Sequence, residues 1–165
     1  MPNEPLERPS ASFSMPTPSV RVAGIALRGT EVLLHRRRGE SFWALPGGRV
    51  DIGETAASAL LREFHEELAC TAVCGNLVYV VENFFAHAGS SLHEVGLYFP
   101  VELQPTSAAM QAVSPFTGPE VELEFQWFPR KALMSANLRP SFLVHALAGA
   151  ELEFQHVVEH RAAGI

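Results

Sequence analysis

The stretch GRVDIGETAASALLREFHEELAC, residues 48–70, decides the fold of this chain. Thr55 is a typical N-cap residue, and most of the residues after it favour helix, so the stretch predicts a helix over residues 56–68. At about 100° per residue, one stripe of this helix is apolar and is expected to pack on the core. The stripe consists of Leu60, Leu61, Phe64 and Leu68.

Three carboxylates share another side of the predicted helix. Glu63, Glu66 and Glu67 are separated by three and four residues, which places them close together on the helix surface. Such a cluster of like charges is unfavourable, more so when partly buried, unless a cation neutralises it. A hard divalent cation with oxygen ligands, such as Mg²⁺, solves that problem. For the helix taken alone, a solvated acidic face is the alternative.

The turn before the helix favours the metal site. Gly47 and Gly48 let the backbone approach a ligand closely, and a glycine carbonyl can serve as a metal ligand. Glu54 lies just before the N-cap and can brace the loop against the start of the helix. Arg62 lies four residues before Glu66 and can hold or orient it.

The spacing of these residues resembles the Nudix box. That signature is a glycine, five residues, a glutamate, seven residues, and then Arg-Glu-aliphatic-any-Glu-Glu-any-Gly-aliphatic. Gly48, Glu54 and residues 62–67 match all of its charged positions. The resemblance covers roughly residues 20–156. It implies a Nudix fold, which is an α/β/α sandwich with a mixed β-sheet, and hydrolysis of a phosphoanhydride bond in a nucleoside diphosphate-linked or nucleoside triphosphate substrate.

The resemblance also implies the metal ligands. Glu63, Glu66 and Glu67 would bind Mg²⁺, which Mn²⁺ can replace, and the carbonyl of Gly47 is a further candidate ligand. The metal would polarise a phosphoryl oxygen and lower the pKa of a bound water, which makes a nucleophile at neutral pH.

The remaining residues of the box have supporting roles in this resemblance. Arg62 and Glu54 would orient the metal ligands, so Arg62 counts among the catalytic candidates. Gly48 and Glu54 would lie beside the bound substrate. Glu67 is also a candidate general base.

The end of the box departs from the signature at two positions. Ala69 stands where glycine would stop the helix in a left-handed conformation, and Cys70 replaces the aliphatic residue. Alanine in that conformation costs about 1 kcal/mol, unless the helix ends differently. Neither position carries chemistry, so the departures concern the helix cap.

Two segments outside the box supply further candidates. Arg37 ends a predicted strand beside the expected cleft, and its guanidinium suits a substrate phosphate, although a surface basic run is the alternative. Alternation along residues 119–124 places Glu120, Glu122 and Glu124 on one face. Nudix enzymes often recruit one more glutamate from a distant loop, so Glu122 or Glu120 is a catalytic candidate. A solvated strand face is the alternative.

Other residues across from the box have weaker claims. His93 and Glu94 can meet the substrate, although a structural role is the stronger interpretation. Phe84, Phe85 and Tyr98 can stack a base, with core packing as the default.

The remaining elements follow from hydrophobic patterning. We expect a flexible Pro- and Ser-rich arm over residues 1–19 and one Nudix domain over residues 20–160. Predicted strands cover residues 20–27, 31–37, 78–81, 95–101, 125–128 and 152–158, residues 42–48 form a short strand or loop, and a second helix covers 141–148. Loops are predicted near residues 86–91 and over 104–119.

Composition limits the partners. The formal net charge is -6, with 18 acidic and 12 basic residues, so no nucleic-acid partner is expected, and a polyanionic substrate needs cations at its site. The chain shows no membrane span or secretory signal, and its two cysteines suggest no disulfide framework, which predicts a cytoplasmic protein. The expected partner is a small nucleotide-like diphosphate. Homodimers are frequent in the family.

Two further functions remain open at this stage. A nucleotide-sensing module without catalysis is disfavoured by the complete set of Arg62, Glu63, Glu66 and Glu67, and no arrangement typical of an isomerase stands out. The substrate itself is not readable, because residues 86–88 carry none of the family's substrate markers.

Overall fold

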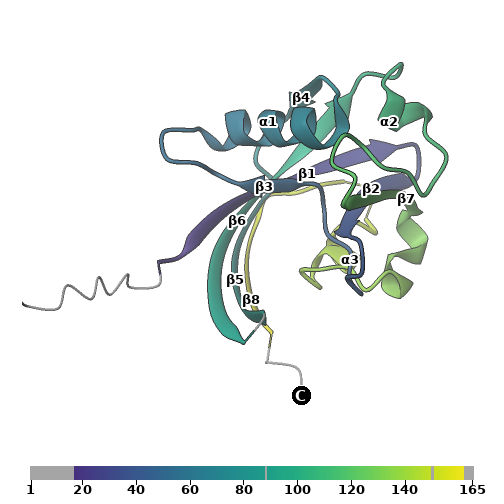
Figure 1. Cartoon of the computed structure of the whole chain (residues 1–165). Helices are drawn as coiled ribbons and strands as arrows, with labels where there is room; N and C mark the ends of the chain where they lie inside the picture. The colour runs from purple at the N-terminus through teal and green to yellow at the C-terminus, as the bar shows by residue number, and fades with distance from the viewer. Residues whose placement is uncertain (1–16, 88, 150, 162–165) are drawn as a thin grey trace, which may run out of the picture.

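A mixed β-sheet flanked by helices on both faces forms the core of the computed structural model, which describes residues 17–87, 89–149 and 151–161 (Figure 1). The strands are β1 (Ser19–Arg28), β2 (Glu31–Arg37), β3 (Gly47–Arg49), β4 (Ala72–Cys74), β5 (Tyr79–His87), β6 (Ser90–Leu103), β7 (Leu123–Pro129) and β8 (Gln155–His160). The helices are α1 (Ala56–Leu68), α2 (Ala108–Gln111), the 3₁₀ helix η1 (Arg130–Ser135) and α3 (Leu143–Ala146).

The strand order is β7-β2-β1-β6-β5-β8, with β3 paired to β1 and β4 paired to β6. The pairs β1–β6 and β5–β8 are parallel and the others are antiparallel, so the predicted mixed sheet is confirmed. Figure 1 shows α1 on one side of the sheet and α3 on the other. This arrangement matches the predicted α/β/α sandwich.

Each face of the sheet carries its own hydrophobic core. Alternation along β1 sends Val22 and Ala26 to the core beneath α1, and Ala23 and Ile25 to the core beneath η1 and α3. Gly24 sits under α1, where an added Cβ would lie 2.5 Å from the ring of Phe64. The helix packs this closely on β1 because position 24 has no side chain.

The predicted N-cap of α1 is confirmed, and its C-terminal end takes one of the two forms that the sequence left open. The hydroxyl oxygen of Thr55 accepts a hydrogen bond from the Ser58 N–H at 3.1 Å, as an N-cap does. Ala69 ends the helix with φ 50° and ψ 36°, which is the left-handed conformation that the signature glycine would adopt.

Several elements differ from the predictions. β5 and β6 are longer than expected and pair from Tyr79–Tyr98 out to His87–Ser90. Polar residues such as Asn83 and Glu94 interrupt the apolar pattern there, so the pattern did not predict the full length of these two strands. The predicted loop over 104–119 contains α2, whose Ala109 carbonyl accepts a hydrogen bond from the Trp127 indole at 3.0 Å. β4 and η1 were not predicted.

The second predicted helix, over 141–148, has only one α-helical turn. The flanking bonds run from Val144 N to the Ser141 carbonyl and from Ala148 N to the His145 carbonyl, and each spans three residues instead of four. The first N–H groups, those of Ser141 and Phe142, bond to the Glu159 carboxylate of β8.

The predicted arm lies mainly outside the described residues, which begin at position 17, and Ser19 already belongs to β1. The domain limits therefore stay a prediction. None of the helices among the described residues has the length and hydrophobicity that a membrane-spanning helix needs.

Candidate active site

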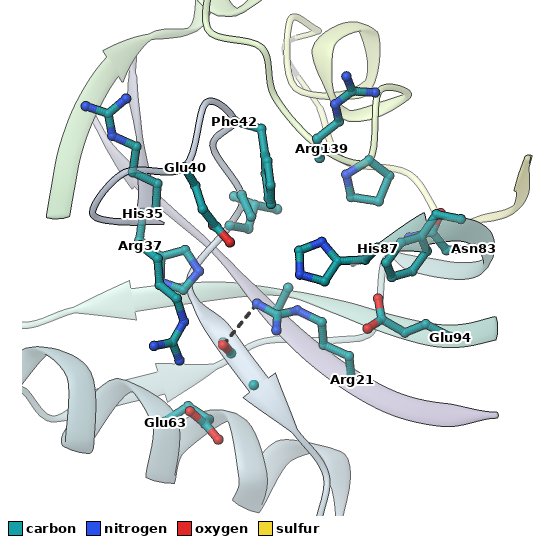
Figure 2. Close-up of a pocket in the computed structure, with 18 of the residues that line it drawn as sticks. Arg21, His35, Arg37, Glu40, Phe42, Glu63, Asn83, His87, Glu94 and Arg139 are labelled. Atoms are coloured by element: carbon teal, nitrogen blue, oxygen red, sulfur yellow. Dashed lines mark hydrogen bonds between the residues drawn. The ribbon is translucent and has the colours of Figure 1, made fainter. Parts of the chain in front are cut away.

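A cleft of about 470 Å³ opens beside α1 and is walled by β1, β2, β3, β5 and β6. Figure 2 shows Glu63 below the cleft on α1, and His35 and Arg37 on the side formed by β2. Asn83 and Glu94 lie on the opposite side. The predicted helix and the hairpin strand therefore meet at one cavity.

Arg62 is the centre of a hydrogen-bond network around the box. Its Nε and Nη2 donate to the two carboxylate oxygens of Glu54 at 2.8 and 3.0 Å. Its Nη1 donates to Glu63 at 2.8 Å and to Glu66 at 3.2 Å. Nη2 also donates to the carbonyl of Arg49. One guanidinium thus joins the loop before the helix to two carboxylates of the helix.

Glu54 has the bracing position that its place in the sequence predicts. Besides both bonds from Arg62, it accepts one from the N–H of Asp51 at 3.2 Å. The Arg62 hydrogen bond, followed by that of the Asp51 N–H, holds the pKa of Glu54 below its ordinary value. Glu54 therefore stays ionised and keeps Arg62 in place.

Glu63 lies against the backbone of the glycine pair. A Cβ at position 48 would collide with the Glu63 carboxylate, so the close approach depends on Gly48. Burial raises the pKa of Glu63, while the Arg62 hydrogen bond lowers it and the charges of Glu67 and Glu66 raise it further. A cation beside this carboxylate would relieve the cost of ionising it.

Glu67 is the most deeply buried carboxylate of the box, with 5% of its surface exposed. It lines the cleft, yet within the described chain its Oε2 has no hydrogen-bond partner. The nearest basic atom is Nδ1 of His35, at 3.4 Å from Oε2. His35 is itself buried and lines the cleft from β2.

Glu66 differs from its two neighbours. Its side chain is 48% exposed and turns toward Arg62, and it is not among the residues that line the cleft. The structure thus brings Glu63 and Glu67 to the cavity and leaves Glu66 at the exposed side of Arg62.

The carbonyl of Gly47 already has one partner. Nη2 of Arg21, from β1, donates to it at 3.0 Å, which Figure 2 marks with a dashed line. Gly47 has φ 147°, and a Cβ there would collide with the backbone of Val22. A carbonyl oxygen has a second lone pair, which stays available for another ligand.

Arg37 and Glu122 form an ion pair at 3.0 Å, with side chains 63% and 78% exposed. Arg37 also lines the cleft, whereas Glu122 does not. Glu120 does line the cleft.

The prediction that Glu120, Glu122 and Glu124 share one strand face is wrong, because residues 119–122 form a turn. That turn is closed by a bond from the Leu123 N–H to the Glu120 carbonyl, and β7 begins only at Leu123. Glu124, inside β7, pairs with Arg36 at 2.8 Å.

The opposite wall of the cleft comes from β5 and β6. Glu94, Phe85 and Tyr98 line it, as does the buried Asn83. His93 instead stacks on Phe84 with ring centroids 4.3 Å apart, and neither residue lines the cleft. Of the predicted pair His93 and Glu94, only Glu94 faces the cavity.

A family model described as the NUDIX domain matches residues 15–145. The chain belongs to the Nudix family. It is 34% identical over 79 residues to a MutT-like protein of Streptomyces ambofaciens, covering 47% of this chain and 51% of that protein. It is 43% identical over 53 residues to an ADP-ribose pyrophosphatase of Methanocaldococcus jannaschii, covering 30% and 31%. The chain therefore spans about half or less of the length of these curated relatives.

A solved structure gives the same fold. A NUDIX hydrolase from Nitrosomonas europaea superposes with a TM-score of 0.66 at 20% identity, over 89% of this chain and 81% of that one. At this identity the likeness concerns the Nudix fold alone.

The Nudix box has donors that suit a hard cation. Glu63 and Glu67 bring carboxylates to the cleft, and Gly47 lines the same cavity. One buried oxygen of Glu67 has no hydrogen bond from any residue that the structure describes. No three acidic, histidine or cysteine side chains among the described residues converge closely enough to form a metal site alone. This donor set fits Mg²⁺, which completes its shell with waters and substrate phosphates.

Arg21, His35 and Asn83 line the cleft of this Nudix chain although the sequence did not mark them as candidates. For His35 the omission matters most, because it lies beside Glu67. One signal was available: in a strand, residues two apart share a face, so His35 shares that of Arg37. A single histidine within an apolar strand otherwise resembles a core residue.

Proposed function

We propose that this Nudix chain is a Mg²⁺-dependent hydrolase that cleaves a phosphoanhydride bond in a nucleoside diphosphate-linked or nucleoside triphosphate substrate. The observation that carries the proposal is the pair Glu63 and Glu67, two carboxylates brought by one helix to the wall of a single cleft. Guanidinium groups of Arg21 and Arg37 lie on the same cavity and suit a polyanion.

Residues of the box would hold the metal. Glu63, Glu66 and Glu67 are the proposed ligands, with the Gly47 carbonyl as a further one, and Mn²⁺ would substitute for Mg²⁺. When bound, the ion would neutralise phosphate charge and make a water molecule more acidic. Arg62 keeps Glu63 and Glu66 oriented, and Glu54 keeps Arg62 oriented.

The reaction itself needs a nucleophile, a base and a way to bind phosphate. Water attacks one phosphorus, the bridging P–O bond breaks, and two phosphate-bearing products leave. Glu67 is the first candidate for the base that takes the proton of the water, because it lines the cleft and is the most deeply buried carboxylate of the box.

Further along the chain, the turn over residues 119–122 supplies the second base candidate. Glu120 faces the cleft, whereas Glu122 is engaged with Arg37. In this proposal Glu122 acts on Arg37, the substrate contact, and Gly48 leaves room for the Glu63 carboxylate beside the bound substrate.

The names of the relatives suggest where a substrate search begins. Relatives are named as ADP-ribose pyrophosphatase, MutT-like protein and 8-oxo-dGTP diphosphatase. A panel of ADP-ribose, nucleoside triphosphates and sugar nucleotides therefore covers the proposed class. The same proposal places the protein in the cytoplasm, where these nucleotides occur.

The test is hydrolysis of that panel by the full chain, with Mg²⁺ and with a chelator. We expect turnover of at least one substrate with Mg²⁺, its loss with the chelator, and strong reduction in Glu66→Gln and Glu67→Gln. Glu102→Gln is the matched control, since Glu102 is exposed on β6 and does not line the cleft. Wild-type turnover in both box variants would refute the site. Binding of ADP-ribose without any product would indicate a sensing module instead.

A further inference from the structure

His35 of β2 and Glu67 of α1 face each other inside the protein. The exposed fractions are 7% for His35 and 5% for Glu67, and 3.4 Å separates Nδ1 of the imidazole from Oε2 of the carboxylate. Both atoms are buried, and neither has a hydrogen-bond partner within the described residues. They are therefore two unpaired polar atoms that lie 3.4 Å apart.

Leaving both atoms unpaired is costly. A buried polar group without a partner costs about 1–3 kcal/mol, and more when it is charged. Two bare acceptors at this separation would repel, so a hydrogen must lie between the two atoms, and when Glu67 is ionised as a metal ligand it is the imidazole Nδ1 that carries it. Closer approach and alignment of the two groups then give a hydrogen bond to a charged acceptor, the stronger kind. Catalytic hydrogen bonds are often long before substrate and metal bind.

The other carboxylates of the box do not need His35. Arg62 donates to Glu54, Glu63 and Glu66, but within the described chain none of its hydrogen bonds reaches Glu67. The most buried carboxylate of the box is thus the one that the central arginine leaves out. His35 is positioned to do for Glu67 what Arg62 does for the others.

We propose that His35 is a positioning residue for Glu67: its Nδ1–H holds Oε2, which fixes the carboxylate so that Oε1 is free to act in the cleft. This inference rests on the proposed function, in which Glu67 is a metal ligand or the base. Partners that orient a metal ligand typically change metal affinity or activity about 10–100-fold when they are removed.

The imidazole ring also fills space, and the test separates the two roles. His35 packs on Phe125 with ring centroids 5.7 Å apart. His35→Phe keeps a ring and removes the donor. His35→Asn removes the ring and keeps an N–H donor at the δ position. A space-filling role therefore predicts that phenylalanine is the better substitute, whereas a positioning role predicts that asparagine is.

The experiment measures Mn²⁺ binding to the metal-free full chain, by electron paramagnetic resonance of free Mn²⁺, together with kcat and KM under Mg²⁺ and the thermal midpoint. We expect His35→Phe to lower kcat about 10–100-fold with little change in KM, and to weaken Mn²⁺ binding. His35→Asn is expected to restore most of both. His93→Phe is the matched control, because that half-buried histidine stacks on Phe84 away from the cleft.

A double-mutant comparison covers the case in which His35→Asn does not fold. If His35 acts through Glu67, His35→Phe adds little to the loss of Mn²⁺ binding already present in Glu67→Gln. Independent losses in the two variants would overturn the inference, as would wild-type Mn²⁺ binding and turnover in His35→Phe.

Failure of this inference differs from failure of the proposed function. If Mn²⁺ binding and turnover are impaired in Glu67→Gln but normal in His35→Phe, only the positioning role of His35 is rejected. Normal Mn²⁺ binding and turnover in Glu67→Gln rejects the role of Glu67, and the positioning role with it.

Discussion

The guanidinium of Arg62 donates to both carboxylate oxygens of Glu54, at 2.8 and 3.0 Å, across the loop that leads into α1. The same guanidinium donates to Glu63 and Glu66, so the orientation of these carboxylates depends on the planar, forked set of N–H donors of Arg62. A lysine carries the same charge as a single point and cannot reproduce that geometry.

Arg62→Lys should therefore lower kcat about tenfold while the chain remains folded. Steady-state hydrolysis with Mg²⁺ and a thermal unfolding scan are the two measurements. Arg49→Lys is the control, since the Arg49 side chain is exposed and only its carbonyl takes part in the network. Unchanged kcat in Arg62→Lys would show that charge alone suffices.

Glu63 gives a prediction about pH and metal. Burial raises its pKa in the folded state, so its favourable contribution is complete below the ordinary value of 4.5 and is lost as pH rises through the raised value. At neutral pH in a chelator, Glu63→Gln should unfold at the same or a higher temperature than the wild type, and the difference should shrink toward pH 4.

Adding Mg²⁺ should reverse that order. The wild type gains thermal stability from the ion at neutral pH, whereas Glu63→Gln gains less, because one ligand is gone. Equal Mg²⁺-induced shifts in the two proteins would remove Glu63 from the metal site.

The left-handed end of α1 gives a prediction about stability. Ala69 has φ 50° and an exposed side chain, so Ala69→Gly removes backbone strain without losing packing. We expect the free energy of unfolding to increase by about 1 kcal/mol, which corresponds to a midpoint about 2–4 °C higher. Ala57→Gly, inside the helix, should do the opposite by a similar amount. A clear loss of stability in Ala69→Gly would contradict this account of the cap.

The turn over residues 119–122 gives Glu120 and Glu122 different surroundings, which the sequence alone could not distinguish. Glu120 lines the cleft and Glu122 pairs with Arg37 outside it, so Glu120→Gln should lower kcat. Glu122→Gln should mainly change KM, through Arg37, and should alter stability by less than about 1 kcal/mol, since the pair is exposed. Each variant controls for the other, and a larger kcat effect of Glu122→Gln would reverse their roles.

The sequence predicted the features of the site that are local. The helix over 56–68, its Thr55 cap and the bond from Arg62 to Glu66 all depend on residues within one or two helical turns. Periodicity and spacing determine such contacts, so these contacts could be predicted from the sequence alone.

Contacts between distant segments were not readable in the same way. His35 meets Glu67 only because β2 and α1 lie at the same cleft, and the position of Glu120 depends on a turn that breaks the expected alternation. The wall that includes Asn83 arises from the extended pairing of β5 and β6. Packing between elements decides these positions, and a single sequence carries little of that information.

The turnover of Glu67→Gln beside Glu102→Gln, on whichever panel substrate the wild type hydrolyses with Mg²⁺, tests the central claim most directly. The account predicts that Glu67→Gln loses most of kcat, by a factor of at least about 10, while keeping its fold, and that Glu102→Gln matches the wild type. Equal turnover of the two variants would contradict a catalytic site at the buried carboxylates of α1.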